Sequence, residues 1–174
     1  MANPLDSVIQ WYTTANDSIR VTRRVLTKGI KSALPKKHAF LNRPAEECSS
    51  LLDSGADELK RVVVLALTAI FERTLRDHLT EIPKAMLPPG DPHHDAVREQ
   101  LIADIEFWNI SARVLDVFPG VAAEVRGEVK QISEYRNWVA HGHTVAKPAP
   151  SNVIPEKAYE RLTRFLDQAG LLSP

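Results

Sequence analysis

Apolar residues recur at intervals of three and four positions along most of this chain, which is the spacing of helices that bury one face. In the middle of the sequence, the run from Val62 to Phe71 is apolar on nearly every side, as is typical of a helix covered by other helices. No stretch shows the alternating pattern of a strand with hairpin signals. The sequence therefore predicts an all-α fold, an up-and-down bundle of about five helices.

Prolines, glycines and capping residues set the expected helix bounds. Pro35 and Pro83 are expected to end the first two helices, because proline lacks the backbone donor and clashes with the preceding turn. Asp57 is a candidate N-cap of the second helix, Asp91 precedes a proline in the first turn of the third, and Gly142 is placed to end the fourth. The predicted helices cover about residues 3–33, 57–82, 92–117, 119–141 and 155–169 of a single domain, 1–174.

The charge of the whole molecule gives no pull towards polyanions, because 22 Lys and Arg residues balance 22 Asp and Glu residues. Any nucleic-acid binding must therefore be local, and the segment 18–45 is locally biased, with eight basic residues and no acidic one. Four of these basic residues are spaced along one side of the first predicted helix and are candidate contacts to a phosphate backbone, namely Arg20, Arg24, Lys28 and Lys31. The alternative is ordinary solvated charge on an exposed helix face.

The number of cysteines and the length of the apolar runs indicate which cellular compartment to expect. Cys48 is alone, so the chain forms no internal disulfide and no Cys-rich zinc site, which fits a reducing compartment. The first residues lack the basic start and apolar run of a secretory signal, and the stretch from Val62 to Phe71 is too short to span a bilayer. We therefore expect a cytoplasmic protein with no membrane partner.

The most informative residue is an arginine on an otherwise apolar helical face. Arg136 lies in register with Val129, Ile132 and Val139. A guanidinium there needs a carboxylate, a phosphate or a subunit boundary to satisfy its donors. A structural ion pair is the alternative to a functional role.

A histidine follows this arginine at the expected end of the helix. His141 lies five residues after Arg136, about 140° further round an ideal helix, so the two side chains converge only if the helix ends or loosens there. An imidazole can exchange a proton with a ribose hydroxyl or a leaving oxygen near neutral pH, while a guanidinium holds the phosphate. This pair therefore suffices for RNA cleavage without a metal ion. The alternative is that His141 only caps the helix C-terminus.

The segment Arg136-Asn137-Trp-Val-Ala-His141-Gly142 resembles the signature of the HEPN superfamily, and its form is similar to the ribonuclease-like branches. The resemblance rests on some ten residues of motif and a loosely similar helical layout. It implies a bundle of four to five helices, a homodimer that brings two motifs together and a metal-independent endoribonuclease activity on RNA. It also implies a place in toxin–antitoxin or defence systems, with an antitoxin or a nucleotidyltransferase as a partner.

The resemblance also implies roles for two neighbours of the pair. Glu72, on an earlier helix, matches an acidic position that faces the motif and would orient Arg136 or fix the tautomer of His141. An ion pair between Glu72 and Arg76, one turn later, is the alternative. Asn137 shares a helical face with His141 and is a candidate to bond the imidazole or the substrate, or else only solvates the surface.

Three further side chains near the motif are candidate substrate contacts. Tyr135 and Trp138 have the rings that stack on unpaired bases, although such residues more often pack between helices or across a dimer interface. His143 adds a second imidazole after Gly142 and is either an aid to catalysis in a dimer or an exposed loop residue.

Other kinds of chemistry have weaker signals. Asp91-Pro-His-His-Asp95 contains a His-Asp pair, but the acids fit helix-start roles and no second set of ligands completes a metal site, so we expect no metal. There is no glycine-rich phosphate loop and no dinucleotide fingerprint, so we expect no cofactor. Two hypotheses remain: an endoribonuclease, and a non-catalytic module in which Arg136 and His141 bind a nucleotide or order a protein interface.

Overall fold

The computed structural model describes residues 2–30, 34, 36–142 and 148–172, and these residues form helices and no strand. The prediction of an all-α helical bundle is therefore confirmed. A π-helical turn and a 3-10 turn separate the third and fourth α-helices. The elements in chain order are α1 (Asp6–Thr27), α2 (Ala45–Met86), α3 (Pro92–Phe107), η2 (Ile110–Val114), η3 (Leu115–Val117), α4 (Ala123–Ala140) and α5 (Pro155–Gln168).

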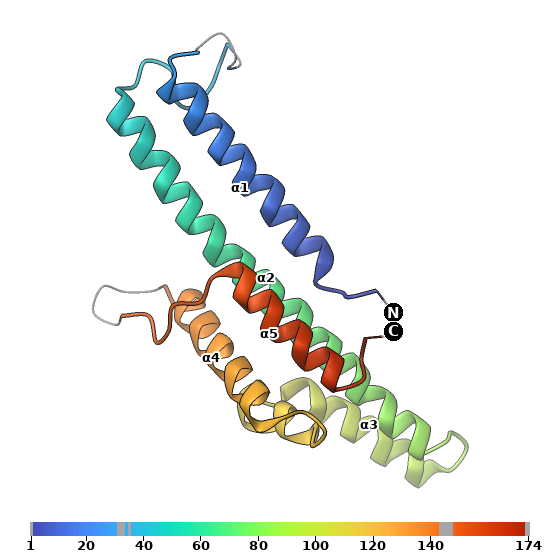
Figure 1. Ribbon diagram of the computed structural model, residues 1–174. Coiled ribbons are helices and arrows are strands. Elements are labelled where there is room, and N and C mark those ends of the chain that lie inside the picture. The colour runs from blue at the N-terminus through green and yellow to red at the C-terminus, as the bar shows by residue number, and fades with distance from the viewer. Residues whose placement is uncertain (1, 31–33, 35, 143–147, 173–174) are drawn as a thin grey trace.

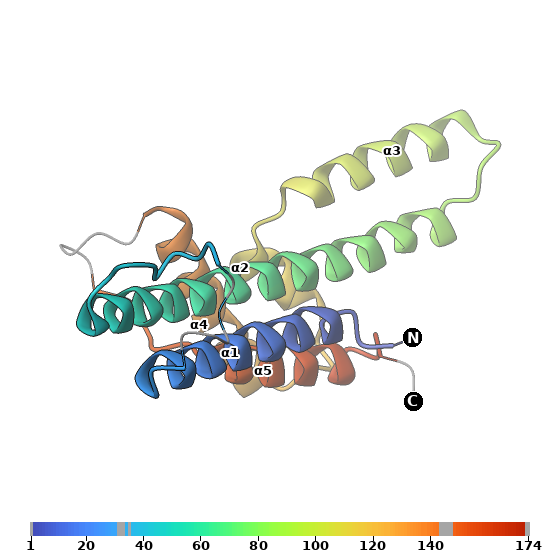
Figure 2. The same cartoon turned by 90° about the horizontal axis from the view of Figure 1, so that it is seen from above.

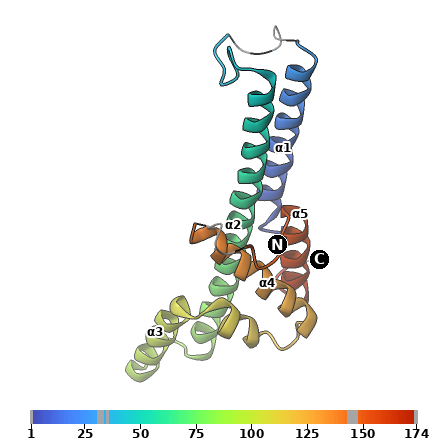
Figure 3. The same cartoon turned by 90° about the vertical axis from the view of Figure 1, so that its left-hand side faces the viewer.

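Helix α2 organises the fold because every other α-helix packs against it. Its 42 residues give an axis of about 63 Å at 1.5 Å per residue. Helix α1 lies antiparallel to the N-terminal half of α2, and α4 and α5 pack beside its central turns (Figures 1 and 3). Helix α3 folds back along the C-terminal end of α2, on the side away from α1 and α5 (Figure 2).

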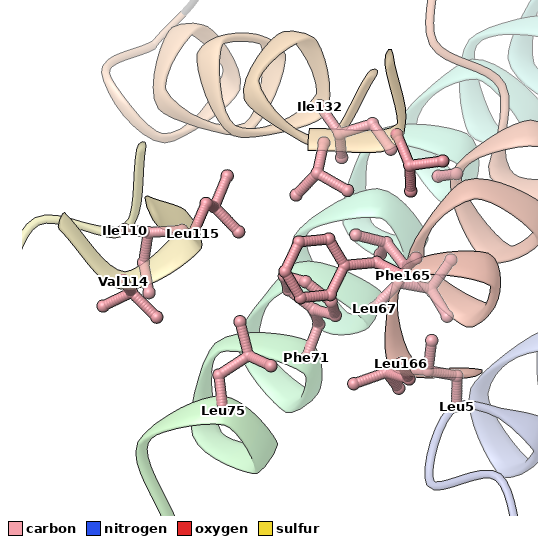
Figure 4. Packing of buried hydrophobic residues seen from close by; sticks show 14 of the residues in the cluster. Leu5, Leu67, Phe71, Leu75, Ile110, Val114, Leu115, Ile132, Phe165 and Leu166 are labelled. Atoms are coloured by element: carbon pink, nitrogen blue, oxygen red, sulfur yellow. The ribbon is translucent and has the colours of Figure 1, made fainter. Parts of the chain in front are cut away.

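Large apolar side chains fill the space where α2, α4, α5 and the turn η2 meet (Figure 4). Phe71 of α2 and Phe165 of α5 are both 0% exposed, and their rings meet edge to face at 5.3 Å between centroids. Phe118 reaches the same Phe165 ring at 5.6 Å, again edge to face. Edge-to-face contacts add to the burial of these rings, so this aromatic group anchors the bundle.

The second helix begins at Ala45, twelve positions before the predicted start at 57. Pro44 is its N-cap residue and no side chain caps it there, so Asp57 lies inside the helix rather than at its start. The added turns bury Cys48 and Leu52 near the end of α1. The prediction missed them because tertiary contact, rather than capping chemistry, extends this helix.

The second helix also continues past its predicted end. Pro83 lies within α2, which runs to Met86, and the Leu87 N–H closes the end by donating to the Pro83 carbonyl at 2.9 Å. Pro83 itself is buried. A proline near a helix end removes only one backbone bond, and burial of its ring against the bundle offsets that loss.

The first helix ends at Thr27 rather than at 33. Gly29 has φ +68°, a left-handed conformation that glycine adopts without a steric cost. Its N–H donates to the Leu26 carbonyl, and the Ile30 N–H donates to the Val25 carbonyl, both at 3.1 Å. These two bonds form a Schellman C-cap, which stops the helix before Pro35 is reached.

The third helix ends at Phe107, ten residues before the predicted end at 117. Trp108 and Asn109 are extended, and the Asn109 side chain accepts a hydrogen bond from the Ala112 N–H at 2.9 Å, which starts η2 as a new turn. Helix α4 begins at Ala123 instead of 119, because the backbone of Ala122 is not helical, with ψ 141°. The fifth helix, 155–168, agrees with its prediction within one residue.

None of the helices in the described part of the chain combines the length and the apolar composition needed to cross a bilayer.

We predict that Phe71→Ala lowers the free energy of unfolding by about 3–5 kcal/mol, because it removes a buried ring and leaves a cavity. Val62→Ala, on the same helix but 43% exposed, is the matched control and is expected to change stability by only about 0.5 kcal/mol. Urea unfolding followed by circular dichroism measures both values. Similar effects for the two variants would contradict the core described above.

A buried phenol between helices predicts a loss of stability at alkaline pH. Burial of Tyr12 raises the pKa of its hydroxyl above the ordinary value, and the carboxylate of Glu156, to which it donates, raises this pKa further. The folded state therefore holds the proton more tightly, so this contribution to stability is complete below about pH 10 and is lost as pH rises through the raised pKa. We expect Tyr12→Phe to make the fall in unfolding free energy above about pH 10 less steep, as measured by urea titrations across that range. Parallel curves for the variant and the wild type would refute this.

Candidate functional site

The last two turns of α4 bring the motif to the surface. Earlier in the helix, Val129 and Ile132 are fully buried in the core, which fixes the rotation of α4 about its axis. Arg136 follows on that side and is only half-buried. The helix ends at Ala140, the His141 N–H donates to the Asn137 carbonyl at 3.0 Å, and Gly142 turns the chain with φ +79°. The predicted end of the fourth helix is thus found within one residue.

The Arg136 guanidinium is held by its neighbour in sequence. Its Nη1 donates to Asn137 Oδ1 at 3.0 Å, and no ion pair joins Arg136 to a carboxylate within the described part of the chain. The alternative of a structural ion pair is therefore not seen there. The guanidinium keeps its charge and several N–H donors for an external anion, and Asn137 is bonded to the arginine rather than to the imidazole.

The His141 side chain is exposed and makes no hydrogen bond or ion pair to the described residues. Because α4 stays helical up to Ala140, Arg136 and His141 keep most of the roughly 140° separation expected for five residues on a helix. No hydrogen bond joins the two side chains. One chain therefore offers both groups at one helix end without uniting them over one pocket.

Glu72 takes the alternative role, as a partner of Arg76. Glu72 Oε2 lies 3.6 Å from Arg76 Nη1, and the two side chains are 16% and 17% exposed. Arg76 Nη2 also donates to the Trp108 carbonyl at 3.0 Å, which ties α2 to the point where α3 ends. No hydrogen bond or ion pair connects Glu72 to Arg136 or His141 among the described residues. Within one chain Glu72 therefore pairs with Arg76, as in the alternative, and its expected role beside the motif stays a prediction.

Tyr135 is 8% exposed and its ring lies 5.7 Å from that of Trp138, centroid to centroid. Trp138 is itself partly buried against the core. This burial favours packing between helices over stacking of Tyr135 on a base. The prediction that Tyr135 contacts substrate therefore has no support in the geometry of this chain.

The basic side chains of α1 lie away from the motif. Arg20, Arg24 and Lys28 are exposed, and Arg20 also pairs with Asp17 at 3.6 Å. Helix α1 packs on α2 and α5, while the motif is at the end of α4 (Figure 1). The structure therefore does not bring this stripe to Arg136 and His141. The last member of the stripe, Lys31, and the candidate residue His143 lie outside the described residues.

Sequence reasoning missed a cavity at the place where α1 ends and α2 begins. It has a volume of about 610 Å³ and lies between the last turns of α1, the connection that follows and the first turns of α2. The signal for it was the basic segment 18–45, which supplies its charged lining. Elsewhere, no three His, Cys, Asp or Glu side chains of the described ranges gather closely enough to hold a metal ion.

No protein-family model matches the chain, no curated protein matches it, and no solved structure matches it. The class that the structure itself defines is an all-α helical protein with an Arg–Asn–His group at one helix end.

The contacts of Arg76 predict how substitutions of Arg76 and Glu72 change the stability of the fold. Arg76→Ala removes a donor to the Trp108 carbonyl and leaves Glu72 unpaired, so we expect the free energy of unfolding to fall by about 1–3 kcal/mol. Glu72→Gln keeps the size of the side chain and is expected to cost about 1 kcal/mol or less. Urea unfolding measures both. If Glu72→Gln instead left stability intact and abolished the RNA cleavage proposed below, the earlier assignment of Glu72 to the motif would be right.

Proposed function

We propose that this protein is an endoribonuclease that cleaves RNA without a metal ion, using Arg136 and His141 from two copies of the chain. The observation that carries the proposal is the exposed end of α4, where a guanidinium without a carboxylate partner among the described residues and an imidazole without a described partner stand within five residues of each other. The resemblance of this segment to the ribonuclease-like HEPN signature supports the same function.

The chemistry is a transesterification. His141 takes the proton from a ribose 2′ hydroxyl, the 2′ oxygen attacks the adjacent phosphorus, and the bond from phosphorus to the 5′ oxygen breaks. Water gives a proton to the departing 5′ oxygen, and the His141 imidazolium afterwards returns its proton to the solvent. Arg136 binds the non-bridging oxygens as negative charge builds on them, and Asn137 positions the guanidinium. The products are a 2′,3′-cyclic phosphate and a 5′ hydroxyl.

The proposal includes a homodimer, because one chain by itself leaves the two groups apart. Five residues on a helix separate Arg136 and His141 by about 140°, and no hydrogen bond joins their side chains, so a single copy is not expected to surround a phosphate with both groups. A two-fold axis near the end of α4 would set the arginine of one copy beside the histidine of the other, and would repeat this at a second site. A toxin or defence role in the cytoplasm, with an antitoxin or nucleotidyltransferase partner, belongs to the same proposal.

The first experiment incubates labelled RNA with the protein in excess EDTA. We expect cleavage by the wild type and losses of about 10²–10⁴-fold for His141→Ala and about 10²–10³-fold for Arg136→Ala. His94→Ala and Arg73→Ala, which alter exposed residues of the same types on other helices, are matched controls and should cleave normally. No cleavage by the wild type at high concentration would refute the nuclease and favour the non-catalytic module.

A mixing experiment tests the shared site. Equal amounts of His141→Ala and Arg136→Ala, unfolded together and refolded, give half heterodimers, each with one intact site of two, so about a quarter of the wild-type activity should return. Refolded wild type is the reference for this yield. If the refolded wild type cleaves RNA but the mixture and the two variants do not, then both groups act from the same chain.

A further inference from the structure

The cavity at the end of the α1–α2 pair is a second candidate site, remote from α4. Its walls come from α1 (Arg23, Leu26), the connection (His38, Phe40, Arg43) and α2 (Leu52) among others. Its volume of about 610 Å³ falls within the range of about 300–1,000 Å³ that is usual for small-molecule sites.

The lining of this cavity favours an anion. Two arginines, one lysine and one histidine line it, and no carboxylate does so among the described residues. Arg23 and Arg43 are paired with Asp53 and Glu47, but those carboxylates are 60% and 47% exposed and lie outside the lining. Exposed ion pairs of this kind are weak, so a phosphate with more charge can share or take over the guanidinium donors.

One arginine of the cavity lining is held in place by a bond to the backbone. Arg43 Nε donates to the Ala39 carbonyl at 2.8 Å, and its Nη1 is bonded to Glu47. Its Nη2 has no partner among the described residues, so both N–H groups of Nη2 and the second one of Nη1 remain. The backbone bond reduces the side-chain freedom that binding would otherwise have to remove.

The rings and aliphatic side chains of the lining suit a flat, aromatic group. The rings of His38 and Phe40 lie 6.1 Å apart between centroids, and Leu26 and Leu52 add aliphatic surface. His38 Nδ1 accepts a hydrogen bond from the Phe40 N–H at 3.1 Å, so a neutral imidazole carries its proton on Nε2 as a donor. Aromatic rings beside single donors and acceptors favour a nucleobase over an alkyl chain, which needs no polar partner.

We propose that this cavity binds a nucleoside monophosphate, with the phosphate on Arg43 and Arg23 and the base against Phe40 and His38. The ligand is held without reaction. The site is separate from Arg136 and His141, since α1 and the start of α2 form it and α4 contributes no lining residue.

The experiment is isothermal titration of the full chain with AMP, GMP, CMP and UMP, and with adenosine and inorganic phosphate as part-ligands. We expect at least one nucleotide to bind more tightly than either part-ligand. Arg43→Gln should weaken binding about tenfold or more, through loss of a charge-assisted hydrogen bond. Ser49→Phe, at an exposed lining position, should block binding by filling the cavity.

Two matched variants make the result decisive. Arg20→Gln removes a similar charge from α1 outside the cavity and should bind as the wild type does. His141→Ala should also bind normally, whether or not the protein is a nuclease. No nucleotide binding at millimolar concentration, or binding lost in His141→Ala and kept in Arg43→Gln, would overturn the proposal.

Discussion

The rest of the structure depends on covering one helix that is apolar on nearly all sides. In the middle of α2, Val63, Val64 and Leu67 are all fully buried. Burial of apolar surface is the dominant favourable term in folding, so α1, α4 and α5 must each present an apolar face to α2. That requirement fixes how α4 is rotated, and therefore which of its residues reach solvent near His141.

The polar groups divide into those that hold the scaffold and those that are left available. Arg76 and Glu72 tie α2 to the end of α3, and the Tyr159 hydroxyl, which donates to Asp6 at 2.7 Å, ties α5 to the start of α1. At the end of α4, by contrast, no carboxylate pairs with Arg136 among the described residues. The proposed site thus lies where the core supplies no carboxylate partner for Arg136 among the described residues.

Helix type and number could be predicted because spacing alone reveals a buried face. The starts of α3 and α5 match their predictions, since both helices have a proline in the first turn, and Asp91 also caps α3. The start of α2 could not be predicted, because Cys48 and Leu52 join the helix through contacts made only in the folded chain. The break after Phe107 was equally hidden, since nothing local forbids the helix from continuing there.

The sequence by itself determined that the chain is helical and that an arginine and a histidine stand together near one helix end, because both facts depend on local spacing. Only the tertiary structure decided which partner Glu72 takes, that Tyr135 is buried, and that the basic segment after Ser18 lines a cavity far from α4. Such outcomes depend on how helices distant in sequence are oriented against each other. Their rotation and crossing arise from the packing of many side chains at once, and no local pattern encodes it.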